Sequence, residues 1–141
     1  YEPGELRVVA YGADGNKVGE TSIHTAGKAA AVALKADKTV LAADGDDLAY
    51  VTVSLVDKDG NELPTASDNI SVEVSGAASF RGICNGDATS LEVFTQPQMK
   101  LFGGKLVVTL QAANAPGVAT LKVVDKSNKN VKPASVEIQV K

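Results

Sequence analysis

The 141-residue sequence has no tryptophan, one cysteine, one histidine, and only three tyrosines and three phenylalanines. The lone Cys84 cannot form a disulfide within the chain, and Cys84 with His24 cannot supply the four nitrogen and sulfur ligands of a structural zinc site. The shortage of aromatic rings disfavours a sugar-binding surface, because such surfaces cover the apolar face of a sugar with exposed rings. We expect no disulfide, no zinc site, no cofactor and no direct sugar binding.

The sequence also lacks an excess of basic residues and any long apolar run. The formal net charge is −3, and no Lys- or Arg-rich segment alternates with aromatic residues, so nucleic acid is not an expected partner. A membrane helix needs about 20 consecutive apolar residues, and the apolar runs here are short and interrupted. We therefore expect a soluble chain with neither a nucleic-acid nor a membrane partner.

The opening residues, YEPGEL, do not have the features of a signal peptide. They contain no basic start, and no apolar stretch follows them. We expect the chain to be either cytoplasmic or a piece of a longer protein.

What the sequence does contain is regular alternation of apolar and polar residues. Successive residues of a strand point to opposite faces of a sheet, so alternation identifies the face that enters the core. The sets expected to point inward are Ala49, Val51, Val53 and Leu55; Ile70, Val72 and Val74; Leu106, Val108 and Leu110; Ala119, Leu121 and Val123; and Val136, Ile138 and Val140.

Turn-forming residues separate these segments about every 8–12 positions, a spacing typical of a β-sandwich. Only residues 26–36, AGKAAAVALKA, have the alanine content of a helix. They follow Gly27 without a convincing cap, so we interpret them as a linker and a strand with Val32 and Leu34 inward. The sequence predicts an all-β fold: an immunoglobulin-like sandwich of about seven antiparallel strands with Greek-key connections, plus an N-terminal hairpin.

The first 27 residues are predicted to form a hairpin. Residues 28–141 by themselves have enough strands for a whole sandwich, so the hairpin is additional to it. A two-stranded ribbon is marginally stable in water unless another layer covers it. We expect residues 1–27 to be the last two strands of a preceding immunoglobulin-like domain, and residues 28–141 to be the C-terminal domain.

Two similar segments, GADGNKV at residues 12–18 and DKDGNEL at residues 57–63, raise the question of a calcium site. An EF-hand loop needs glycine at its sixth position and glutamate at its twelfth. Counting from Asp57, Gly60 is fourth and Asp68 is twelfth. Asp-Gly pairs favour a hairpin turn that closes on glycine, so we predict a turn at both places.

The acidic segment Asp44, Asp46 and Asp47 is the best candidate for metal chemistry, since clustered carboxylates bind hard cations such as calcium. The favoured alternative is a solvated loop in which one carboxylate accepts backbone N–H groups. Asn85-Gly86-Asp87 is likewise interpreted as a structural turn, with contact to a neighbouring domain as the second interpretation.

The remaining reactive side chains favour structural roles. His24 ends the second expected strand without an orienting partner for base catalysis. Cys84 has no second histidine to activate it, so we expect a buried, inert thiol. Phe80, Phe94 and Phe102 lie beside apolar runs and are expected in the core or at a domain contact, whereas Tyr50 is expected on the polar face of its strand.

Several ordered segments resemble a known family. They are Pro3-Gly4-Glu5-Leu6, Thr25-Ala26-Gly27, Ala43-Asp44-Gly45-Asp46-Asp47-Leu48, Asp57 with Asp59-Gly60-Asn61, Asn85-Gly86-Asp87, and Phe102 with Gly104. In this order the set resembles the C-terminal immunoglobulin-like modules of bacterial glycoside hydrolase family 2 β-galactosidases.

The resemblance implies a non-catalytic accessory domain of a periplasmic or secreted enzyme. In that family two glutamates of an upstream (β/α)₈ barrel perform catalysis, and the barrel is not in this sequence. The glutamates here fall in turns or on outward strand positions, which indicates no retaining pair; they are Glu2, Glu5, Glu20, Glu62, Glu73, Glu92 and Glu137. Expected partners are other domains of the parent chain or a dimer partner. A carbohydrate-binding module and an adhesin-type stalk repeat stay open as alternatives.

Overall fold

The computed structural model describes residues 2–141. Within that range the regular secondary structure consists entirely of β-strands. The strands are β1 (Glu5–Tyr11), β2 (Lys17–His24), β3 (Ala31–Ala36), β4 (Val40–Leu41), β5 (Leu48–Val56), β6 (Asn69–Gly76), β7 (Ala78–Cys84), β8 (Gln98–Lys100), β9 (Lys105–Ala112), β10 (Gly117–Asp125) and β11 (Ala134–Val140). The all-β prediction is confirmed. Within the described range no helix is long and apolar enough to span a membrane.

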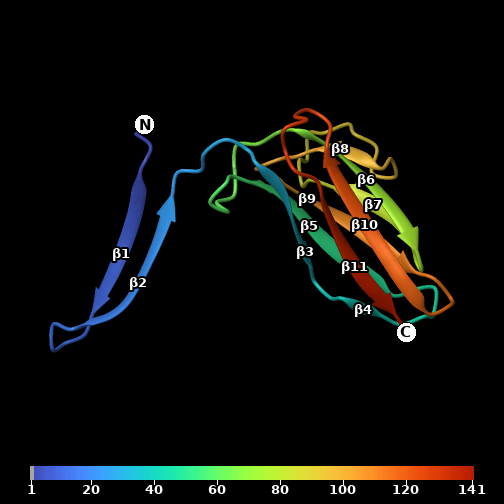
Figure 1. Ribbon diagram of the computed structural model, residues 1–141, viewed down its shortest axis with the longest axis horizontal. Helices are drawn as coiled ribbons and strands as arrows, with labels where there is room; N and C mark the ends of the chain where they lie inside the picture. Colours follow the sequence, from blue (N-terminus) through green and yellow to red (C-terminus); the bar gives the residue numbers. More distant parts are fainter. Residues whose placement is uncertain (1) are drawn as a thin grey trace.

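Two stacked sheets form the body of the molecule (Figure 1). The larger has the strand order β4-β11-β10-β6-β8, and the smaller has the order β3-β5-β9-β7. Paired strands are antiparallel except β4, which runs parallel to β11. The two sheets contain more strands than the seven expected. The additional strands are β4 and β8, which are only two and three residues long. Strands of that length are too short for alternation to reveal them.

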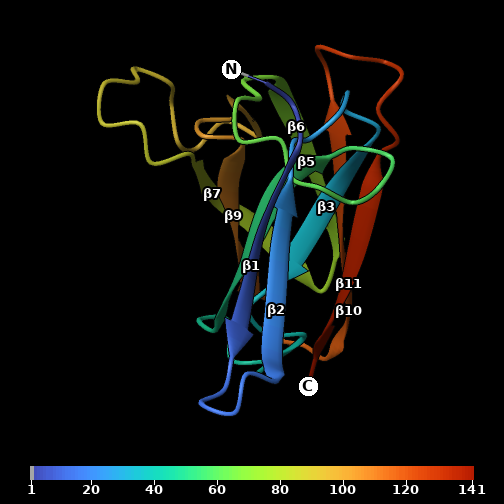
Figure 2. The same ribbon diagram turned by 90° about the vertical axis from the view of Figure 1, so that its left-hand side faces the viewer.

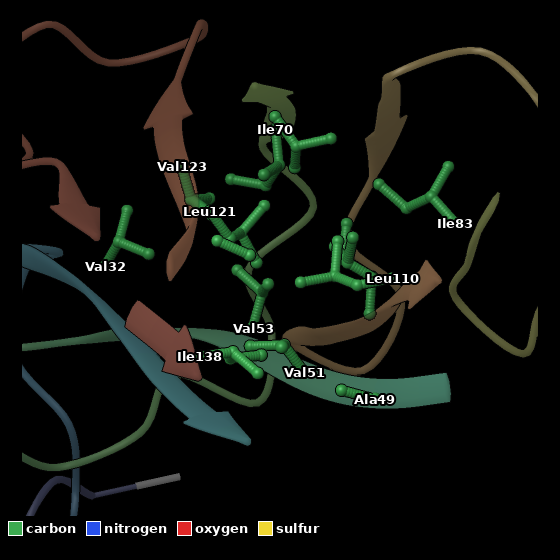
Figure 3. Packing of buried hydrophobic residues seen from close by; sticks show 14 of the residues in the cluster. Val32, Ala49, Val51, Val53, Ile70, Ile83, Leu110, Leu121, Val123 and Ile138 are labelled. Carbon is green, nitrogen blue, oxygen red and sulfur yellow. The ribbon is translucent and has the colours of Figure 1, made fainter. Parts of the chain in front are cut away.

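The core lies between the two sheets and consists of the side chains that alternation assigned to it. Side chains of β5 and β9 face those of β6, β10 and β11 (Figure 3). Val53 and Leu121, from opposite sheets, are both 0% exposed. Val74 and Val136 are partly buried and pack at the margin of the core. This apolar layer supplies most of the driving force for folding, because burial removes apolar surface from water.

Residues 26–36 form a linker and a strand, as predicted, and no helix. The Val32 side chain is buried, and Leu34 packs against the core from a partly buried position. The Val32 N–H donates to the carbonyl of Lys132 at 2.9 Å, and the Lys132 N–H donates to the carbonyl of Ala30 at 2.9 Å. These bonds join the start of β3 to the segment before β11, so tertiary pairing outweighs the helix preference of alanine.

β1 and β2 form a separate two-stranded sheet that stands beside the sandwich and joins it through residues 25–30 (Figures 1 and 2). Leu6 pairs with Ile23 across the hairpin, and the two residues are 64% and 66% exposed. Val8, two positions along the same face, is 57% exposed. The hairpin therefore presents an uncovered apolar face.

Candidate functional site

The junction between the hairpin and the sandwich is organised by Asp57, at the end of β5. The Gly27 N–H donates to Oδ2 of Asp57 at 2.7 Å, and the N–H groups of Asp59 and Asn61 each donate to Oδ1 at 2.9 Å. Asp57 is buried. The Gly27 N–H, followed by the Asn61 side-chain amide, holds the pKa of the Asp57 carboxyl well below its usual range.

A single residue separates the hydrogen-bonded part of the hairpin from the hydrogen-bonded part of the sandwich. The Thr25 N–H donates to the carbonyl of Gly4 at 2.9 Å, and the Gly4 N–H donates to Oγ1 of Thr25 at 3.0 Å. On the other side, Gly27 is held by Asp57. Ala26 lies between them. A hollow of about 1130 Å³ opens at this junction, with His24, Lys28 and Asp59 in its lining. The junction is thus a short, tethered linker beside an open hollow.

The two Asp-Gly segments form the same turn, as predicted. In the first, the Gly12 N–H donates to Asn16 O and the Gly15 N–H donates to Gly12 O. In the second, Asp57 N–H donates to Asn61 O and Gly60 N–H donates to Asp57 O. The second turn is followed by one bridge, Val56 to Glu62, in place of a full returning strand.

The acidic loop before β5 uses two of its carboxylates to hold its own backbone. Oδ1 of Asp44 accepts the N–H groups of Asp46 at 2.9 Å and Asp47 at 2.8 Å, and these bonds lower the pKa of Asp44. The Asp47 carboxylate forms an ion pair with Lys38, which lowers the pKa of Asp47, and its Oδ2 accepts the Ala42 N–H at 2.9 Å. The prediction that a carboxylate of this loop accepts backbone N–H groups is confirmed.

No calcium-like arrangement is formed by these groups. In residues 2–141, no group of three or more His, Cys, Asp or Glu side chains is placed to hold a metal ion. The geometry of the Asp44, Asp46 and Asp47 segment is that of a closed loop, and the loop is further fixed where the side-chain amide of Gln111 donates to the carbonyl of Gly45 at 2.6 Å.

His24 ends β2, as predicted, and its side chain is exposed. Its Nε2 lies 4.0 Å from Oε1 of Glu5, its cross-strand neighbour, and 3.4 Å from Oγ of Ser22. This small exposed group does not enclose a reacting atom.

The prediction of a buried thiol is wrong, since Cys84 is exposed at the end of β7. The register of β7 against β9 shifts between Phe80 and Gly82. Phe80 and Ile83 consequently both face the core, opposite Leu110 and Val108, and the next residue, Cys84, points outward. A β-bulge inserts one residue and so reverses the alternation beyond it.

The phenylalanines have different environments. Phe80 packs against the core from a partly buried position, but Phe94 and Phe102 are each 54% exposed, so the core interpretation is wrong for these two. Tyr50 lies on the outer face of β5 at 46% exposure, as expected. Asn85 caps the turn that follows β7, where its Oδ1 accepts the Asp87 N–H at 3.0 Å. Sequence reasoning missed the exposed phenylalanines because apolar neighbours in the chain do not imply neighbours in space.

Comparison with known proteins identifies the family to which the chain belongs. The family described as glycoside hydrolase family 2 C-terminal domain 5 matches residues 32–137. The chain belongs to this family. It is 40% identical over 121 residues to a β-galactosidase of Bacteroides ovatus, a match that covers 86% of this chain and 14% of that protein. The resemblance found in the sequence is confirmed, and the chain spans only a small part of the relative's length.

The same relationship holds in three dimensions. A crystal structure of a glycosyl hydrolase family 2 member from Bacteroides cellulosilyticus superposes with a TM-score of 0.90 at 30% identity, covering 100% of this chain and 18% of that one. Because residues 28–141 make up about four-fifths of the sequence, this score requires the hairpin to superpose together with the sandwich. The D00-D0 domain of intimin shares the fold alone, with a TM-score of 0.57 at 17% identity over 98% of this chain and 65% of that domain.

Proposed function

We propose that this chain is a non-catalytic accessory region of a family 2 β-galactosidase, and that it acts by packing against other domains of the parent chain. The observation that carries the proposal is the match of residues 32–137 to a C-terminal domain of this enzyme family. The similarity to the Bacteroides ovatus β-galactosidase supports the choice of parent enzyme.

The hairpin supports the packing role. We propose that residues 1–27 complete a preceding immunoglobulin-like domain, because Leu6, Val8 and Ile23 leave an apolar face of the ribbon in water. A ribbon of two strands is marginally stable by itself, and neighbouring strands or a covering layer would stabilise it. Domain interfaces within one chain bury roughly 600–1,500 Å², an area that would accommodate this face.

Two other functions make different predictions. A carbohydrate-binding module would respond to oligosaccharides, yet the exposed rings among residues 2–141, Tyr11, Tyr50, Phe94 and Phe102, come from four different segments of the chain. An adhesin-type stalk repeat would share the sandwich, as the intimin domain does, but its parent would contain a row of similar modules in place of an enzyme.

The decisive experiment compares the purified chain with the parent enzyme. We expect the chain of residues 1–141 to release no product from aryl-galactosides under conditions in which the parent turns over, and to give no chemical-shift changes with millimolar galacto-oligosaccharides. Turnover that persists after a contaminating galactosidase has been removed would contradict the non-catalytic role. Saturable shifts with the oligosaccharides would favour the carbohydrate-binding alternative.

The periplasmic or secreted location implied by the family resemblance is part of this proposal. Fractionation of cells that express the parent protein tests it directly. Recovery of the parent in the cytoplasmic fraction alone would contradict an exported enzyme.

A further inference from the structure

Asn85 and Gly86 form the only Asn-Gly pair in the sequence. In such a pair the peptide nitrogen of the glycine can attack the side-chain carbonyl carbon of the asparagine, because glycine has no Cβ to hinder the approach. The chain also has Asp-Gly pairs at residues 14–15, 44–45 and 59–60, but a carboxylate is a weaker electrophile than a carboxamide. Asn85 is therefore the side chain most prone to attack by the backbone that follows it.

The structure leaves the attacking nitrogen accessible. Gly86 is exposed in the turn after β7, and a Cβ at this position would meet nothing within 4 Å. Within residues 2–141 the Gly86 N–H donates to no protein acceptor. In the two Asp-Gly turns described above, by contrast, the Gly15 and Gly60 N–H groups are bonded. The Gly86 nitrogen can therefore lose its proton to hydroxide in the solvent, which makes it a nucleophile.

The fold anchors the other reacting group, the side-chain amide of Asn85. Its Oδ1 accepts the Asp87 N–H at 3.0 Å, and its Nδ2 donates to the carbonyl of Lys100, on β8, at 3.0 Å. The reaction brings Cγ of Asn85 to bonding distance from the Gly86 nitrogen, and the amide can make this movement only after it leaves these partners. Asn85 is half-buried, and β8 is a three-residue strand at the edge of the larger sheet. Local opening is therefore enough to release the amide.

We propose that Asn85 is a modification site at which the chain deamidates without an enzyme, at a rate set by the opening of this turn. The deprotonated Gly86 nitrogen forms a bond to Cγ of Asn85, the bond between Cγ and Nδ2 breaks, and Nδ2 leaves as ammonia. Water then opens the resulting succinimide ring at either of its carbonyl groups, which gives aspartate or isoaspartate. The reaction consumes water and releases ammonia, and it is independent of the proposed packing function.

The product cannot restore the contacts that the Asn85 amide makes. The amide donates to the Lys100 carbonyl, whereas an ionised carboxylate has no hydrogen to donate and would place an oxygen against that carbonyl oxygen. The new negative charge would also join Asp87 and Glu92, which line the same hollow of about 390 Å³ as Asn85. Like charges at short range repel. Deamidation therefore removes a tie between the loop of residues 85–97 and β8 permanently.

The lost tie is one of two by which the loop holds the backbone of Lys100. Oε1 of Glu92 accepts the Lys100 N–H at 3.1 Å, and Asn85 donates to the carbonyl of the same residue. The later part of the loop is held separately, since the Ile83 N–H, on β7, donates to the carbonyl of Phe94 at 2.8 Å. We therefore expect deamidation to loosen residues 87–92 while the attachment at Phe94 is kept.

Mass spectrometry of the aged protein tests the modification. The chain of residues 1–141 is kept at mildly alkaline pH, and the mass gain from replacement of the amide by a hydroxyl is followed in peptides that contain Asn85 or Asn128. Asn128 is the matched internal control: its Oδ1 accepts the Asn130 N–H at 3.0 Å in the same kind of turn, but Lys129 follows it in place of glycine.

We expect Asn85 to deamidate at least tenfold faster than Asn128, with isoaspartate among the products. We also expect Asn85 to react at least tenfold more slowly in the folded chain than in a synthetic peptide of residues 80–90, because the peptide lacks the anchors to Lys100 and the rest of the fold. Equal rates at Asn85 and Asn128 would overturn the site. Equal rates in the folded chain and the peptide would overturn control by the opening of the turn.

Asn85→Asp tests the release of the loop, because it installs one of the products directly. We expect hydrogen exchange of the amides in residues 87–92 to be at least fivefold faster in the variant than in the wild type, and exchange in the turn of residues 125–131 to be unchanged. The same comparison between fresh and aged wild-type chain does not depend on the folding of the variant. Unchanged exchange in residues 87–92 would overturn the release, and equal acceleration in both segments would overturn its local character.

Discussion

The carboxylate of Asp57 accepts the backbone N–H of Gly27 at 2.7 Å, across 30 positions of sequence. This contact ties the linker that leaves the hairpin to the end of β5, in the smaller sheet of the sandwich. The same carboxylate also holds the turn that follows β5. One buried side chain therefore controls both the shape of a loop and the point at which the two parts of the molecule meet.

Replacement of this carboxylate should loosen the junction. We expect Asp57→Asn to lower the unfolding temperature by several degrees, because the amide presents one acceptor oxygen to donors that now share two. We also expect small-angle scattering to show a broader range of hairpin orientations. Asp59→Asn is the matched control, since the Asp59 side chain is exposed and forms a surface ion pair with Lys58. Identical unfolding and scattering for the two variants would contradict the role assigned to Asp57.

The chain should lose stability in acid. Hydrogen bonds and ion pairs lower the pKa of seven carboxyl groups. They are those of Asp14, Glu20, Asp44, Asp47, Asp57, Glu62 and Asp87. A carboxyl whose pKa is lower in the folded state than in the unfolded state stabilises the fold at pH values above its unfolded-state pKa. This stabilisation is lost as the pH falls from the unfolded-state pKa toward the folded-state pKa. We expect the unfolding temperature to be nearly constant from about pH 8 to 5 and to fall below about pH 4, where free carboxyls titrate.

Asp57→Asn should remove part of this acid sensitivity. The difference in unfolding temperature between the wild type and the variant is expected to be largest near neutral pH and to shrink in acid, because the carboxyl of Asp57 takes up a proton in the unfolded chain before it does so in the folded one. A difference that stays constant from pH 7 to pH 3 would show that ionised Asp57 contributes no pH-dependent stability.

Two glycines with left-handed backbone should respond differently to alanine. Gly76 ends β6 with φ of 82°, and a Cβ there would lie 2.0 Å from the carbonyl oxygen of Val118. Gly60 has φ of 85°, but a Cβ there meets nothing within 4 Å. We expect Gly60→Ala to cost about 1 kcal/mol in the free energy of unfolding and Gly76→Ala to cost more than about 3 kcal/mol. Urea titration measures both, and equal costs would mean that the close approach to Val118 is not part of the fold.

The thiol of Cys84 should react in the native protein. Because the side chain is exposed, one equivalent of a thiol reagent is expected to react without denaturant, at a rate that urea increases only modestly. A thiol that reacts only after unfolding would restore the buried position predicted from the sequence and contradict the bulge in β7.

The sequence predicted the core well because each long strand of the sandwich has a buried face. Val51 and Val53 are separated by a polar residue, and that spacing alone assigns them to the same side. The prediction of a buried Cys84 failed because it came from the lack of an activating histidine, which does not determine burial. The side chain points outward because a bulge changes the phase of the alternation in β7, and the bulge depends on how β7 pairs with β9. Phase cannot be read from the composition of a single strand.

The candidate sites were less predictable than the core. The turn at Asp57 was expected from the Asp-Gly pair, but its bond to Gly27 depends on tertiary folding. Leu91 and Phe94 resemble core residues in the sequence, and only their position in an extended loop shows that they are exposed. Local chemistry was therefore predictable, whereas contacts between distant segments and the exposure of loop residues were not.

Hydrogen–deuterium exchange of the hairpin tests the central claim most directly. In the chain of residues 1–141, the outward N–H groups of β1 and β2 have no neighbouring strand, and we expect them to exchange rapidly. In the parent enzyme we expect the same amides to be protected by at least tenfold, because further strands and domains cover the ribbon. Equally rapid exchange in the parent and in the isolated chain would contradict the account of this region as a domain that functions by packing.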